Sequence, residues 1–307
     1  MTDGILIETI SKSFDKVQSL ASVSAEIAFG SVYGLIGTNG AGKSTLLRIL
    51  AGIYRQDAGT VLYSGREVWE NTEVKGEIFY LPDDPFFFAN GTVGETARYY
   101  KSLYRRWSEE TYRKLVKEFG LNTERKVSTF SRGMQKQAAI LLALSCRPRY
   151  LLCDETFDGL DPAMRQFVKR LFMEEVADGN LTPVIASHNL REIEDICDRA
   201  GLLHRGEMLF SRGLDDMRDG VRKVQLVLPE GKDETVLRAG KFASLRVSDV
   251  RRSGSMVSFL AHGTEEAITA AVAEVLPVWS QLLPLSLEEI FICETEEKGY
   301  DFTECLG

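Results

Sequence analysis

The sequence predicts an α/β fold built around a parallel sheet, with a helical segment inserted into the chain. A strand-like run, a glycine-rich loop and a helix-like run follow one another over residues 32–50. Residues 95–145 are almost wholly helix-like, and strand-like runs resume at Tyr150. Because strands that alternate with helices favour a parallel sheet, we expect the helical segment to be an arm set into that core.

Antiparallel strands are expected ahead of this core. Apolar and polar residues alternate over 23–29, and together with 5–7 this pattern is typical of paired strands with one buried face. Thr92 and Glu95 have the spacing of a capping box, which predicts a helix start. Breaks in the helical segment are expected near Ser108, Gly120 and Thr129, and further strands at 61–65, 78–82, 150–153, 184–187, 201–204 and 208–211.

A change of composition near residue 220 predicts two domains. Residues 1–219 would hold the α/β core, an antiparallel β subdomain and a helical subdomain at about 90–147. Residues 220–307 carry nine Lys/Arg against fourteen Asp/Glu, and no catalytic pattern is visible in them. They are expected to form a small C-terminal α/β accessory domain, with strands at 224–228, 245–250 and 256–261 and a helix at 265–276.

The glycine-rich loop fits the phosphate-binding pattern G-x-x-x-x-G-K-[ST] from Gly37 to Ser44. Its glycines allow backbone N–H groups and the helix N-terminus to point at a triphosphate. Lys43 is expected to reach the β- and γ-phosphates, and the Ser44 hydroxyl to take one position on Mg²⁺. The expected ligand is a nucleoside triphosphate, held by Gly37, Thr38, Asn39, Gly40, Ala41, Gly42, Lys43, Ser44 and Thr45.

The apolar run 150–153 ends in Asp154 and Glu155, as a buried strand does when its carboxyl end opens on a ligand cleft. Asp154 is expected to hold Mg²⁺, directly or through water, opposite Ser44. Glu155, one residue further on, points elsewhere and is the expected general base for an attacking water.

Ser131 and Gly133 stand at the start of a long predicted helix between these two motifs. A helix N-terminus attracts anions, although the same pattern is typical of a plain serine N-cap. The position of the pair, shortly before the strand that ends in Asp154, favours anion binding.

These motifs together resemble the ATP-binding-cassette (ABC) ATPases, in the same order from about Ile5 to Ser211. The matching segments are the Walker A loop at 37–44, the signature at 130–134, Walker B at 150–155, the D-loop at 159–162 and the switch histidine at 185–188.

The resemblance implies a P-loop NTPase core that hydrolyses ATP, and a head-to-tail homodimer or heterodimer around the nucleotides. Ser131 and Gly133 would contact the γ-phosphate bound by the opposite subunit, and Phe14 would stack on adenine, although a Phe there is as often core. The residues implied in catalysis are Glu155, His188 and Lys43, and Asp161 of the D-loop is an implied nucleotide contact.

The implied function is that of the ATP-binding subunit of an ABC transporter, peripheral on the cytoplasmic face of the cell membrane. The segment 286–292 resembles the ending of export-type subunits, which implies export of a small molecule, drug, peptide or lipid-like substrate through a separate permease. A helical block at 83–107 is the expected docking face for that permease. The alternative is a non-transport regulatory ABC ATPase.

Asp83 is a departure from the family pattern, because the family usually has Gln there. A carboxylate near a triphosphate is repulsive, so Asp83 should bind Mg²⁺ through water, swing away, or serve only to shape a turn. Arg132 and Met134 also replace the usual signature residues, a change that looks tolerable because Ser131 and Gly133 remain.

The bulk properties limit the remaining classes of function. The net charge of −8 gives no electrostatic basis for nucleic-acid binding. The five cysteines form no C-x-x-C pair, so free thiols in a reducing compartment are expected. No apolar stretch reaches the roughly 20 residues that a membrane-spanning helix needs.

Overall fold

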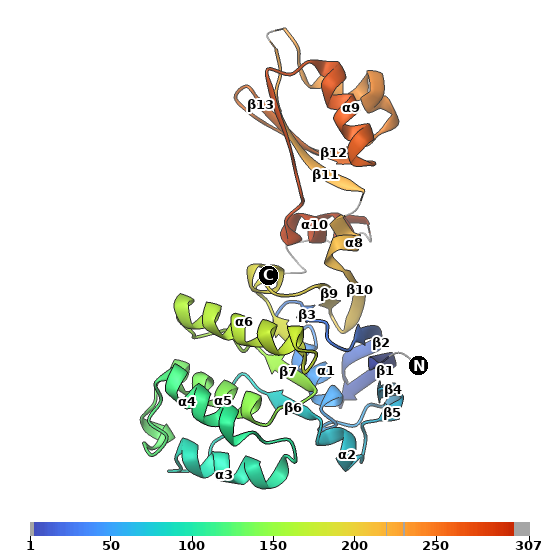
Figure 1. Cartoon of the computed structure of the whole chain (residues 1–307). Helices are drawn as coiled ribbons and strands as arrows, with labels where there is room; N and C mark the ends of the chain where they lie inside the picture. The colour runs from blue at the N-terminus through green and yellow to red at the C-terminus, as the bar shows by residue number, and fades with distance from the viewer. Residues whose placement is uncertain (1–2, 219, 230, 298–307) are drawn as a thin grey trace. The chain divides into compact units, whose positions relative to one another are not determined.

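The computed structural model describes residues 3–218, 220–229 and 231–297, which fall into two compact units that meet at residue 211 in the chain (Figure 1). The division comes earlier than the predicted boundary at 219, because α8 (Leu214–Arg218) groups with the second unit. The domain boundaries remain a prediction: separate domains at residues 1–219 and 220–307, with a helical subdomain at about 90–147.

An antiparallel sheet opens the first unit, with strand order β2-β1-β4-β5. The predicted alternation is realised in β2, where buried and exposed residues follow one another so that one face packs inward. Register shifts interrupt the pairing of β1 with β2 after Ile7, where the strands bend. The strands are β1 (Gly4–Phe14), β2 (Val17–Ala28), β4 (Ala58–Tyr63) and β5 (Arg66–Glu67).

A second sheet carries the core of the first unit, in the order β10-β9-β3-β8-β7-β6. The pairs β9–β3, β3–β8, β8–β7 and β7–β6 are parallel, so the carboxyl ends of these strands meet at one edge. Every residue of β3, β7 and β8 is buried, as their continuous apolar runs require. The strands are β3 (Tyr33–Ile36), β6 (Ile78–Leu81), β7 (Tyr150–Asp154), β8 (Thr182–Ser187), β9 (Arg199–His204) and β10 (Glu207–Gly213).

Helix α1 (Lys43–Leu50) is buried in the core between the two sheets. Leu46, Leu47, Ile49 and Leu50 share one apolar cluster with residues of the antiparallel sheet and of β3, β7 and β8. At the end of the helix, the buried Tyr63 hydroxyl donates to the Leu50 carbonyl at 2.8 Å. This bond satisfies a carbonyl that a helix C-terminus would otherwise leave without a donor.

The helical arm consists of α3 (Val93–Leu103), α4 (Glu109–Phe119), the 3₁₀ turn η1 (Val127–Thr129) and α5 (Arg132–Ser145). The capping box predicted at Thr92 and Glu95 is present, with both of its hydrogen bonds formed. Ser108 caps the start of α4, and Gly120 ends it with a left-handed φ of 64°. The predicted breaks are therefore confirmed. Residues 83–92 are not helical, however, so the expected docking block begins as a loop, since Pro82 and Pro85 disfavour a helix there.

Three further helices complete the first unit: α2 (Thr72–Lys75), α6 (Pro162–Ala177) and α7 (Leu190–Glu194). Asp161 is the N-cap of α6, and its side chain accepts from the Met164 amide at 2.9 Å. Pro162 follows at the first helical position, where a missing N–H costs nothing.

The second unit is a small α/β structure, as predicted. Its antiparallel sheet has the order β12-β13-β11-β14 and shares an apolar core with α9 that includes Phe242 and Phe259. Ser286 and Glu289 form a capping box at the start of α10. The elements are α8, β11 (Val221–Val227), η2 (Glu234–Arg238), η3 (Gly240–Ser244), β12 (Arg246–Ser253), β13 (Met256–His262), α9 (Glu265–Val275), β14 (Trp279–Leu283) and α10 (Leu287–Glu297).

Three cysteines, Cys146, Cys153 and Cys197, are buried free thiols, whereas the side chains of Cys293 and Cys305 lie outside the described residues. Burial raises the pKa of the Cys153 thiol to about 12. In the part of the chain that the structure describes, no helix combines the length and the apolar character needed to cross a bilayer.

Truncation of Leu47 to alanine should lower the free energy of unfolding of the first unit by about 2–5 kcal/mol, because the cavity would lie in a core contacted from both sheets. Leu103→Ala is the matched control, since Leu103 is exposed on α3. Urea unfolding followed by fluorescence would measure both variants. Equal losses of stability in the two would contradict the central role of α1.

Candidate nucleotide-binding site

The glycine-rich loop runs from the end of β3 into α1, as the sequence predicts. Gly42 is the N-cap of α1 with a left-handed φ of 108°, and it contributes no capping side chain. Gly40 is also left-handed, with φ 84°. The first amides of α1 are therefore left open toward the loop, which is the arrangement that binds phosphate oxygens.

Lys43, the first residue of α1, is almost completely buried beneath this loop. Its ammonium donates to the Gly37 carbonyl at 2.7 Å and to the Thr38 carbonyl at 3.2 Å. It also lies 3.3 Å from Glu155 Oε1. The residue that should clamp the phosphates thus contacts the carboxylate that should activate water.

Ser44 and Asp154 face one another across the site, as predicted. The Ser44 hydroxyl donates to Asp154 Oδ1 at 3.0 Å, and the Tyr80 hydroxyl donates to Asp154 Oδ2 at 3.1 Å. Burial, with the Asp154 charge nearby, raises the pKa of Tyr80 to about 12, so this hydroxyl stays protonated and remains a donor. Both oxygens of Asp154 are held in place by their donors.

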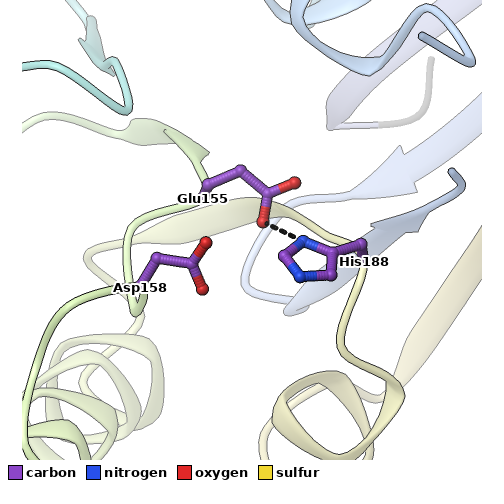
Figure 2. A group of neighbouring side chains, drawn as sticks. All are labelled: Glu155, Asp158 and His188. Carbon is purple, nitrogen blue, oxygen red and sulfur yellow. Dashed lines mark hydrogen bonds and ion pairs between the residues drawn. The ribbon is translucent and has the colours of Figure 1, made fainter. Parts of the chain in front are cut away.

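Glu155 lies just beyond the end of β7 with a left-handed φ of 47°, a conformation that costs a non-glycine residue energy. Its Oε2 lies 3.1 Å from Nδ1 of His188, which follows β8. Figure 2 shows these side chains and Asp158 pointing toward a common space, and ligand atoms of the three lie within 4.8 Å of one another. Two carboxylates and an imidazole at these distances could also hold a metal ion.

A cavity of 350 Å³ lies against the loop. Gly37 and Ala41 are buried and do not line it, and Phe14, at the end of β1, does not line it either. Ser19 lines it and donates to the Thr45 hydroxyl at 2.9 Å, a contact that the sequence alone did not indicate. The lining residues are Ser19, Thr38, Asn39, Gly40, Gly42, Lys43, Ser44, Thr45, Asp83, Asp154 and Glu155.

Ser131, Gly133 and Asp161 do not line this cavity. Ser131 caps α5 by accepting from the Met134 amide at 3.2 Å, and it is exposed. A Cβ atom on Gly133 would approach the Gly159 carbonyl to 2.9 Å, so a glycine is needed where α5 meets the D-loop. The plain N-cap interpretation of Ser131 therefore holds within one chain.

Asp83 is turned toward α5 and forms an ion pair with Lys136, with 2.9 Å between Oδ1 and Nζ. Sequence analysis missed Lys136, Tyr80 and Asp158. A usable signal existed for Lys136, which is the one charged residue between Met134 and Ser145. A lone lysine on an otherwise apolar helix face needs a partner when it is buried.

The profile of the family described as "ABC transporter" matches residues 20–158. The ABC transporter ATP-binding protein YtrB of Bacillus subtilis (strain 168) is 30% identical over 291 residues, which are 94% of this chain and 97% of that protein. The chain belongs to the ATP-binding proteins of ABC transporters. It is an ABC ATPase that binds ATP and serves ATP-driven transport, and these relatives do not support the alternative of a regulatory ATPase outside transport.

Other ABC proteins are similar over about two thirds of this chain. The lantibiotic transport ATP-binding protein SrtF of Streptococcus pyogenes is 31% identical over 68% of this chain and 90% of that protein. A solved structure described as the ATP binding subunit of an ABC transporter is 26% identical, with a TM-score of 0.65 over 70% of this chain and 92% of the other. The predicted α/β P-loop fold is therefore confirmed.

Substitution of Gly42 by alanine should weaken MgATP binding by about tenfold or more, because a Cβ atom there would meet the Ser19 carbonyl at 2.7 Å. Gly40→Ala is the control, since it carries the same left-handed backbone but has no atom within 4 Å of the added Cβ. Titration with a fluorescent ATP analogue compares them. If both variants lost the same affinity, backbone strain alone would explain the loss.

Proposed function

We propose that this chain hydrolyses ATP with Glu155 as the general base and thereby drives export through a separate membrane permease. The position of Glu155 carries the proposal. Its Oε1 lies 3.3 Å from the Lys43 ammonium, and its Oε2 lies 3.1 Å from His188 Nδ1. A carboxylate in this position lies beside the lysine that would hold the γ-phosphate. It can therefore accept the proton of a water molecule that attacks that phosphate.

Mg²⁺ fits the oxygen donors of the site. A hydroxyl and a carboxylate are ligands that this ion prefers, and Ser44 Oγ lies 3.0 Å from Asp154 Oδ1. When bound, the ion would offset the negative charge of the phosphates. Ser44 and Asp154 would hold it, Tyr80 would keep Asp154 oriented, and Lys43 would hold the β- and γ-phosphates.

The active assembly is a head-to-tail dimer, either of two copies of this chain or with a second ATPase chain. Ser131 is exposed and lies outside the phosphate cavity of its own chain, which supports its use by a partner. In such a dimer Ser131 and Gly133 contact the γ-phosphate bound by the opposite subunit. Asp161 lies at the same interface between the two subunits. Each site would then be completed only when two subunits close around ATP.

Phe14 is the proposed adenine contact. Its side chain is 41% exposed at the end of β1, which argues against a role in the core. It packs edge-on against Tyr54 with 5.5 Å between the ring centroids, so the Phe14 ring is held in a defined orientation.

Transport is supported by the name of the lantibiotic transport relative, and export in particular by the segment 286–292 at the start of α10, which resembles the ending of export-type subunits. The permease is a separate chain, and the ATPase lies on the cytoplasmic face of the membrane. The transported compound is a small molecule, drug, peptide or lipid-like substrate.

The permease would dock on an aromatic surface formed by Phe86, Phe87, Phe88, Tyr99, Tyr100 and Tyr104. Phe86 is 72% exposed, and Phe88 and Tyr99 are also exposed, whereas the other members are half-buried. A neighbouring cavity of 210 Å³ is lined mainly by aromatic and other apolar side chains, including Phe79 and Leu142. An apolar patch of this kind is typical of a protein–protein contact.

Glu155→Gln should lower kcat by about 10²-fold or more while ATP still binds, because only the proton acceptor is lost. The same variant should elute as a dimer when ATP is present, since hydrolysis no longer reopens the assembly. Steady-state ATPase assays and light scattering on a sizing column measure the two effects.

Glu118→Gln, an exposed acid on α4, is the control and should behave as the wild type in both measurements. Normal turnover of Glu155→Gln would refute the base assignment. A strict monomer at high concentration with ATP would instead indicate an obligate heterodimer with a second ATPase chain.

Phe86→Ser should reduce recovery of the chain with membranes when it is co-expressed with the permease of a neighbouring gene, because it removes the most exposed ring of the aromatic surface. Ile53→Ser is the control, since Ile53 is exposed outside this surface. Immunoblots of membrane and soluble fractions give the ratio. Equal membrane recovery of both variants would place the docking face elsewhere.

A further inference from the structure

Two acidic residues stand at equivalent positions beyond neighbouring strands. Leu81 of β6 pairs in register with Cys153 of β7, and the strands run parallel. Asp83 and Glu155 each follow two residues after this pair. Because paired strands lie about 4.8 Å apart, the two loops leave the sheet side by side.

Lys136 of α5 reaches both loops with one ammonium group. Its Nζ donates to Asp83 Oδ1 at 2.9 Å and to the Glu155 main-chain oxygen at 2.6 Å. The lysine side chain is only 10% exposed, whereas that of Asp83 is 65% exposed. The cation is therefore the fixed partner of this pair, and the carboxylate is the one that can move.

The contact to Glu155 supports a strained piece of backbone. Glu155 has φ 47°, and its amide donates to the Ala186 carbonyl at 3.0 Å. Its carbonyl accepts from Lys136. Strained residues persist where the surroundings fix them on both sides, and here Ala186 and Lys136 do so.

The contact to Asp83 controls a negative charge at the nucleotide cavity. Asp83 lines the cavity that the phosphate loop also lines, and it lines a second cavity of 420 Å³ together with Lys136 and Asp158. An unpaired carboxylate there would repel a triphosphate. With Lys136 beside it, the pair presents little net charge to the nucleotide.

We propose that Lys136 is a positioning residue of this ATPase: it neutralises Asp83 toward the triphosphate and holds the backbone of Glu155 in its catalytic place. This inference rests on the proposed role of Glu155. It explains how the chain accommodates a carboxylate in the β6–α3 loop, because the compensating cation comes from α5 and contacts both loops.

The test is a double-mutant cycle in the full-length chain, with kcat and KM for MgATP as readouts. Lys136→Met should raise KM about tenfold, because Asp83 is left unpaired, and should lower kcat about tenfold, because Glu155 loses its donor. Asp83→Asn alone should not raise KM. In the double variant KM should return to within about twofold of the wild type, whereas kcat should stay low.

Recovery of KM without recovery of kcat distinguishes a positioning role from a merely structural one. If Lys136 were only structural, its loss would lower thermal stability, and the double variant would not regain the wild-type KM. The exposed pair Lys101–Glu109, with 3.0 Å between its charged atoms, is the matched control. Lys101→Met, Glu109→Gln and their combination should leave KM and kcat within about twofold of the wild type, because exposed ion pairs contribute little.

Two outcomes would overturn the inference: an unchanged KM in Lys136→Met, or a KM that stays raised in the double variant. If Lys136→Met does not fold, Lys136→Gln tests the charge alone: its amide keeps a donor for Glu155, so KM should rise and be restored by Asp83→Asn while kcat stays near that of the wild type. Normal turnover of Glu155→Gln would refute the proposed function itself, so the two failures can be told apart.

Discussion

The burial of α1 between the two sheets is the constraint on which the nucleotide site depends. A helix of eight residues is too short to be stable alone, since isolated helices shorter than about 12–15 residues are marginal in water. Its four apolar side chains pack on both sheets, and each fully buried one contributes about 1.5–3 kcal/mol. The phosphate loop keeps its shape because its last residues begin this helix.

The parallel pairing of β6, β7, β8 and β3 meets a second requirement of the site, because it brings side chains from distant segments to one edge of the sheet. The three residues proposed for catalysis follow three different strands of this sheet. Lys43 follows β3, Glu155 follows β7 and His188 follows β8. Segments far apart in the sequence therefore meet at distances near 3 Å.

Most of the fold and the centre of the site could be predicted because their signals are local. The phosphate loop, the strand ending in Asp154 and the capping box at Thr92 are short patterns whose chemistry determines their conformation. Contacts between distant segments could not be predicted in this way. Tyr80 and Lys136 each act on a partner more than fifty residues away. The pairing of β6 with β7 brings Tyr80 to Asp154, and the packing of α5 brings Lys136 to Asp83.

The left-handed backbone of Glu155 has a consequence for how this position can change. Glycine, asparagine and aspartate adopt that conformation more readily than glutamate does. Substitution by glycine would relieve the local strain and remove the carboxylate in the same step. Local stability and the proposed role of Glu155 as general base thus favour different residues at position 155.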